Sequence, residues 1–123
     1  MLRVRSCGSV KIISIDRAEL MARLRQIASR VCADHREASS VRMFGSIARG
    51  DHVGTSDVDV LIVLRGAESC DELEQTRLFY PYFDLPIGVD LLVCTEDQVA
   101  RRLQEDPALR RLWQESIVLC ANV

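Results

Sequence analysis

The chain has little of what marks disulfide frameworks, zinc sites or membrane spans. Its five cysteines are odd in number and none stands in a Cys-x-x-Cys pair, which argues against a disulfide framework or a zinc site and for a reducing environment. No apolar stretch approaches the roughly 20 residues of a membrane span. The N-terminal residues include no apolar run of signal-peptide length. These absences predict a soluble, cytoplasmic protein.

An excess of charge of either sign is also missing, and lysine is nearly absent. Sixteen basic residues, of which Lys11 is the single lysine, stand against 18 acidic residues, so the net charge is −2. This balance gives no general attraction to nucleic acid or to an anionic membrane surface. We attribute the scarcity of lysine to genome composition rather than to function.

The composition predicts one domain behind a short N-terminal segment. The 123 residues match the common domain size of roughly 100–150 residues, and 48% apolar residues suffice for an ordinary packed core. There are no internal repeats, low-complexity tracts or evident linkers. We expect residues 1–15 to be loosely ordered apart from a short strand at 10–14, and residues 16–123 to form the domain.

Helices and strands alternate along this domain. Asp16, with Glu19 three residues later, marks the start of a helix that has one apolar face. Thr95 is the expected N-cap of a second helix, and Pro107 begins a last one. Apolar runs predict strands at 40–44, 57–64, 89–94 and 117–120, the last at an edge. A less regular helix is expected at 70–79, before a loop rich in proline and aromatic residues at 79–88.

This order of elements predicts a small α/β (α+β) domain, with a mixed β-sheet and helices packed on one of its faces. The run at 57–64 is apolar on both faces, which is typical of an interior strand.

Two aspartates, Asp57 and Asp59, stand at the head of that interior strand. A strand repeats every two residues, so both carboxylates point to one face while Val58 points to the other. Two like charges buried without partners are costly, and a divalent cation such as Mg²⁺ resolves the conflict because it prefers carboxylate oxygens. Asp90, at the head of another apolar run, offers a third carboxylate for a two-metal site of the kind used in nucleotidyl transfer.

A candidate anion site precedes the aspartates by one loop. Gly45 ends a predicted strand and allows close approach of a phosphate to the backbone. Ser46 adds a hydroxyl where a short helix-compatible stretch begins, and free N–H groups at such a start favour anions. An Asp-x-Asp alone more often marks a strand-entry turn. Together with the Gly-Ser pair, it favours a site for a metal-bound nucleoside triphosphate.

The segment FGSIARGDHVGTSDVDVLIVL resembles the signature of the DNA polymerase beta-like nucleotidyltransferase superfamily, which is Gly-Ser, ten residues and Asp-x-Asp. In length and layout the chain is similar, over roughly residues 16–120, to the minimal nucleotidyltransferases. Those are often encoded beside a HEPN-domain partner and act as antitoxins. The resemblance implies a Mg²⁺-dependent enzyme that moves a nucleoside monophosphate, AMP from ATP above all, to a hydroxyl of a partner protein such as a HEPN-domain toxin.

The resemblance also assigns roles on the phosphate side of the site. Gly45 and Ser46 would hold the β- and γ-phosphates of the nucleotide. Arg49 could reach a phosphate or could cap the turn, and both readings stay open. Ser56 is expected to steady the aspartate loop.

The same resemblance assigns the carboxylates. Asp57 and Asp59 would ligate both metals. Asp90 would ligate the catalytic metal and help to deprotonate the attacking hydroxyl.

Two other functions fit the same residues. The first keeps the reaction but uses a small-molecule acceptor, such as an antibiotic. The second is a non-catalytic antitoxin that neutralises a toxin by covering it. The presence of all three carboxylates favours an active enzyme, and the short chain leaves little room for an acceptor pocket of its own.

The aromatic residues of the 79–88 loop could stack a base or meet a partner, but packing is at least as well supported, and Trp113 is expected in the core.

Overall fold

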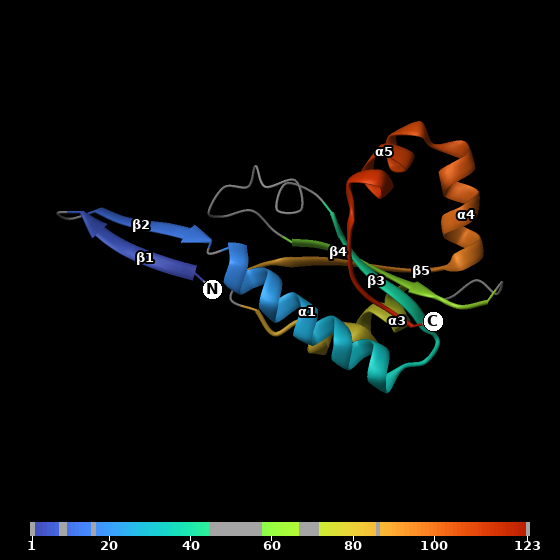
Figure 1. Ribbon diagram of the computed structural model, residues 1–123, viewed down its shortest axis with the longest axis horizontal. Coiled ribbons are helices and arrows are strands. Elements are labelled where there is room, and N and C mark those ends of the chain that lie inside the picture. Colours follow the sequence, from blue (N-terminus) through green and yellow to red (C-terminus); the bar gives the residue numbers. More distant parts are fainter. Residues whose placement is uncertain are drawn as a thin grey trace.

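A four-stranded mixed sheet forms the centre of the computed structural model (Figure 1), which describes residues 2–7, 10–15, 17–44, 58–66, 72–85 and 87–122. The strands are β3 (Ala38–Phe44), β4 (Val58–Leu64), β5 (Val89–Thr95) and β6 (Ile117–Ala121), in the order β5-β4-β3-β6. β3 runs antiparallel to β4 and β6, and β4 runs parallel to β5. The predicted α+β class, the interior position of β4 and the edge position of β6 are confirmed.

Helices α1 (Arg17–Asp34) and α3 (Glu72–Phe79) cover one face of this sheet. The apolar stripe of α1 packs against the side chains of β4 that point to that face, Val58, Val60 and Ile62. Phe79, at the end of α3, has no exposed surface and lies in the same core. The alternation along β4 therefore sends its even-numbered residues into the main core, as the period of two requires.

Helices α4 (Glu96–Glu105) and α5 (Pro107–Glu115) lie on the opposite side of the sheet from α1 (Figure 1). They cover a second, smaller core that includes Leu61, Val63 and Cys94. The sequence predicts helices on one face, and the second layer arises because these odd-numbered residues of β4 are as apolar as the even-numbered ones. α4 and α5 cover only part of this face, which leaves a cavity beside them.

The helix starts at Thr95 and Pro107 follow the sequence closely. The Thr95 side chain accepts a hydrogen bond from the Gln98 backbone N–H (3.2 Å), and the Gln98 side chain accepts one from the Thr95 N–H (2.8 Å). This reciprocal pair is a capping box at the start of α4. Asp106 caps α5 through the N–H groups of Ala108 and Leu109.

The aromatic residues after α3 divide between core and surface. Phe79 and Phe83 are buried, which supports the packing interpretation for both, while Tyr80 remains 49% exposed in the short 3-10 helix η1 (Tyr80–Tyr82). The Tyr82 hydroxyl donates a hydrogen bond to the Asp34 carboxylate at 2.7 Å. His35, next to Asp34, packs edge-on against Phe79. The turn after α3 is thus tied to the C-terminal end of α1.

Two further strands, β1 (Leu2–Cys7) and β2 (Val10–Ile15), pair antiparallel ahead of α1 and form a sheet separate from the central one. The sequence indicates β2 but not β1. The pairing gives a regular partner to a segment that was expected to be loosely ordered, and the domain boundary at residues 15 and 16 stays a prediction. Within the described part of the chain, no helix is both long and apolar enough to cross a membrane.

Candidate active site

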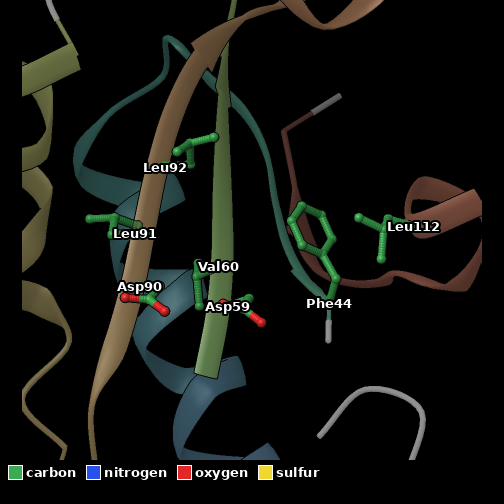
Figure 2. Close-up of a pocket in the computed structure, with 7 residues that line it drawn as sticks. All are labelled: Phe44, Asp59, Val60, Asp90, Leu91, Leu92 and Leu112. Carbon is green, nitrogen blue, oxygen red and sulfur yellow. The ribbon is translucent and has the colours of Figure 1, made fainter. Parts of the chain in front are cut away.

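Asp59 and Asp90 lie side by side on the parallel strands β4 and β5. They are register partners, so their Cα atoms face each other across one strand spacing of roughly 4.8 Å. Both side chains line one cavity of about 560 Å³ (Figure 2), on the face of the sheet that carries α4 and α5. Asp59 is half-buried and Asp90 is exposed. Two carboxylates that the sequence places far apart therefore meet at one point on the sheet.

Phe44 extends this pair into a row across three strands. It is the last residue of β3 and the register partner of Asp59, on the side away from β5. The next residue in the chain is Gly45, and Asp57 directly precedes the first residue of β4. The segment that carries the Gly-Ser motif is therefore joined to the sheet at both ends beside the Asp59–Asp90 pair.

Apolar side chains complete the cavity. Leu92 follows Asp90 by two residues on β5 and is 43% exposed, while Leu112 reaches the cavity from α5 and lies beyond Phe44 in Figure 2. The sequence alone marks neither Phe44 nor these two leucines as site residues. The strand period could have indicated Leu92, because it shares a face with Asp90. No local signal marks Leu112, whose place depends on how α5 packs.

The structure describes the positions of two of the predicted site residues, Asp59 and Asp90. Gly45, Ser46, Arg49, Ser56 and Asp57 lie outside the described residues, and their roles stay predictions. Within the described ranges no group of three potential metal ligands occurs. Two of the three predicted carboxylates, Asp59 and Asp90, are brought together; the third belongs to the segment that is not described.

The donor set fits a hard divalent cation. Carboxylate oxygens are the ligands that Mg²⁺ prefers, and it commonly takes only one or two of them from the protein, together with water and substrate phosphates. Asp59 and Asp90 supply two carboxylates at neighbouring positions of one cavity. A bound cation would be favoured by these two negative charges on adjacent strands.

Comparison with known proteins agrees with this fold and identifies the family. The family model for the nucleotidyltransferase domain matches residues 24–120, a range that includes the whole central sheet and both Asp59 and Asp90. The crystal structure of a proposed nucleotidyltransferase from Sulfolobus solfataricus has a TM-score of 0.61 and 22% identity, over 83% of this chain and 80% of that one. This similarity supports the fold.

A crystal structure of a toxin–antitoxin with AMP-PNP has a TM-score of 0.45 and 16% identity, over 87% of this chain and 74% of that one. No curated protein matches the chain in sequence. Because the family model covers well over half of the chain, the resemblance read from the sequence is confirmed at the family level: the chain belongs to the nucleotidyltransferase domain family.

Proposed function

We propose that the protein transfers AMP from ATP to a hydroxyl group of a partner protein, with Mg²⁺ as cofactor, and that it does so in the cytoplasm. The observation that carries this proposal is the pairing of Asp59 with Asp90 in one cavity of a nucleotidyltransferase-family chain. The family supports nucleotidyl transfer in general. The donor, the metal and the acceptor are our inference.

Asp59 and Asp90, together with Asp57, would hold the metal. When bound, Mg²⁺ would neutralise charge on the transferred phosphate and orient it. The exposed carboxylate of Asp90 is the group that would accept the proton of the acceptor hydroxyl, as a general base does. The new bond joins the acceptor oxygen to the α-phosphorus of ATP, the bond from that phosphorus to the bridging oxygen breaks, and pyrophosphate leaves.

Residues of the Gly-Ser segment would hold the phosphates that leave. Gly45 and Ser46 are assigned to the β- and γ-phosphates, Arg49 to a phosphate, and Ser56 to support of the aspartate loop. The support is the sequence motif together with the position of Phe44, which joins this segment to the sheet at the register row of Asp59.

The acceptor would approach from outside the domain. β5 is at one edge of the sheet, and both Asp90 and Leu92 on it are exposed on the cavity side. An open rim of this kind favours an acceptor carried by another macromolecule over a small molecule enclosed in a pocket. Together with the resemblance to minimal nucleotidyltransferases, this leads us to propose a HEPN-domain toxin as the partner and antitoxin action as the role.

Intact mass spectrometry of the partner tests the proposal. The protein is co-expressed with the product of the neighbouring gene as wild type, as Asp59→Asn and as Asp84→Asn, the last a matched control because Asp84 is an exposed loop residue outside the cavity. We expect one or more added AMP groups with wild type and with Asp84→Asn, and none with Asp59→Asn. Protection from the toxin without any mass change would overturn the proposal in favour of a binding module. Turnover of a small hydroxylated compound instead would favour a small-molecule transferase.

A further inference from the structure

Arg42 connects the sheet to α5 beside the cavity. It lies on β3 two residues before Phe44, so both side chains are on the same face of the sheet. Its guanidinium carbon is 3.8 Å from the centre of the Trp113 ring, and its Nη1 donates a hydrogen bond to the Ser116 hydroxyl at 3.0 Å. That hydroxyl in turn donates to the Trp113 backbone carbonyl. Arg42 thus contacts the C-terminal end of α5 at two points, the Trp113 ring and the Ser116 hydroxyl.

Partial burial of the Arg42 guanidinium is energetically unfavourable. Burial lowers the pKa of Arg42 from its ordinary value, because a low-dielectric environment disfavours the charged form. Its Nε atom is buried and has no hydrogen-bond partner among the described residues. Buried donors without partners are rare in native proteins, so the position of this side chain calls for an explanation.

The attachment of α5 to the sheet indicates a role for Arg42 in holding this helix. No residue of α5 is fully buried, so this helix has only a shallow apolar contact with the sheet. Trp113 makes part of that contact and Arg42 covers its ring. Leu112 is the neighbour of Trp113, about 100° further around the helix, and lines the cavity with Phe44 and Asp59 (Figure 2). A fixed Trp113 therefore fixes the side of the cavity to which Leu112 belongs.

We infer that Arg42 is a positioning residue for the nucleotide site: by holding Trp113 and Ser116 it keeps Leu112 in place as the cavity wall on the side away from Asp90. The inference rests on the proposed function, since the cavity is taken as the place where the donor nucleotide binds. Arg42 itself does not line the cavity, and it acts through α5.

The first test asks whether Arg42 covers the Trp113 ring, and it is done without any nucleotide. Trp113 is the single tryptophan of the chain, so tryptophan fluorescence reports on the surroundings of this ring, which include Arg42. Acrylamide should quench it more strongly in Arg42→Met than in wild type, because the ring loses its cover. Arg77→Met, at an exposed position on α3, is the matched control and should behave as wild type. Equal quenching in Arg42→Met and wild type would overturn the inference.

The second test asks what this contact is for, with Mg·ATP as the probe in isothermal titration calorimetry. The Arg42→Met variant should raise the Kd for Mg·ATP roughly two- to thirtyfold, the range expected for loss of a cation–π contact. Leu112→Ala should also weaken binding. Since Arg42 acts through Leu112, the double variant should bind no more weakly than the weaker of the two single variants. Arg42→Lys keeps a cation over the ring and should recover most of the affinity.

The outcomes separate this inference from the proposed function. If wild type binds Mg·ATP and Arg42→Met binds it equally well, or if the two single effects add, Arg42 has no positioning role. If wild type does not bind Mg·ATP, the proposed function fails and the positioning role falls with it. Should Arg42→Met not fold, Ser116→Ala, which removes only the hydroxyl, gives the same test and should shift the Kd in the same direction.

Discussion

Asp59 on β4 and Asp90 on β5 are register partners on two parallel strands that are connected through α3. Parallel neighbours need a crossover connection, and here the helix of that crossover is anchored by the fully buried Phe79. The two carboxylates are thus brought together by a crossover that includes α3. The proposed site is therefore a product of the tertiary fold and not of one local motif.

The first prediction concerns Asp90. Replacement by asparagine keeps the shape of the side chain but removes the base and one carboxylate from the cavity. We expect the rate of AMP transfer to fall by roughly 10²- to 10⁴-fold, the usual contribution of general acid–base catalysis. The melting temperature should stay close to that of wild type, because Asp90 is exposed. Release of pyrophosphate in the presence of the acceptor measures the rate, and an unchanged rate would remove Asp90 from the mechanism.

The second prediction concerns the capping box of α4. Thr95 is almost fully buried, and its hydroxyl accepts the hydrogen bond of the Gln98 N–H. Thr95→Ala should cost about 1 kcal/mol of stability, which lowers the melting temperature by roughly 3–6 °C for a domain of this size. Thr95→Ser keeps the hydroxyl and should lose less. Thermal unfolding followed by circular dichroism measures both, and equal melting temperatures for the Ala and Ser variants would contradict the cap.

The third prediction concerns Asn122, which follows β6. Its side-chain amide nitrogen lies 2.9 Å from the carbonyl oxygens of Cys32 and Ala38, and 3.4 Å from that of His35. It thus donates to the carbonyl oxygens of Cys32 in the last turn of α1, of His35 directly after α1, and of Ala38 at the start of β3. Asn122→Ala should cost about 1–3 kcal/mol, as expected when partly buried acceptors lose their donor.

Asn122→Asp is the sharper variant at this position. It has nearly the same shape, but it directs a carboxylate, which only accepts hydrogen bonds, at three carbonyl oxygens. It should therefore destabilise the protein more than Asn122→Ala at pH 7, and less as the pH falls and the carboxyl takes up a proton. Urea unfolding at pH 7 and pH 4 measures the difference. An Asp variant as stable as wild type would show that these hydrogen bonds do not hold α1.

The fourth prediction concerns Cys32 in α1. Burial, together with a hydrogen bond to the Cys120 thiol, raises the pKa of Cys32 from 9.0 to about 12. At pH 8 this leaves roughly a thousandfold less thiolate than an ordinary cysteine has, and the thiolate is the reactive form. Iodoacetamide should label Cys120, which is more exposed, well before Cys32 in the native protein. Peptide mapping after timed quenching measures both rates.

The same pKa gives a sign for stability. The folded state keeps the Cys32 thiol protonated to a higher pH than the unfolded state does. The contribution of the Cys32 thiol to stability is therefore fully present below about pH 9 and declines as the pH rises from about 9 toward about 12. Cys32→Ala should lack this part of the pH dependence. A wild type that loses stability no faster than Cys32→Ala in this range would contradict the assignment.

The parts of the fold that the sequence predicts well are those with a strong local cause. The run at 57–64 becomes apolar on both faces after its two aspartates, which is typical of an interior strand. Thr95 and Pro107 are helix-start residues with a defined chemistry. Asp59 and Asp90 each precede an apolar run, which marks them as candidate site residues, and the structure brings them together.

The parts that the sequence did not reveal depend on contacts between distant elements. The second helix layer buries the apolar side chains of Leu61 and Val63. The sequences of α4 and α5 do not indicate on which face of the sheet these helices pack. Leu112 becomes a cavity residue only through that choice. The contact between Arg42 and Trp113 likewise joins β3 to α5, two elements far apart in the sequence. Trp113 packs against the second core, as the sequence predicts, but its ring also contacts the Arg42 guanidinium.

The edge position of β5 has a consequence for how the protein would lose activity. Among the strands that the structure describes, β5 has one neighbour, β4, whereas the strand that carries Asp59 has neighbours on both sides. Edge strands open locally at a lower free energy than interior strands do. Mild denaturant should therefore separate Asp90 from Asp59 while α1 and β4 remain folded. We expect transfer activity to disappear at a lower urea concentration than the helical circular dichroism signal. The protein would then lose activity before it unfolds as a whole.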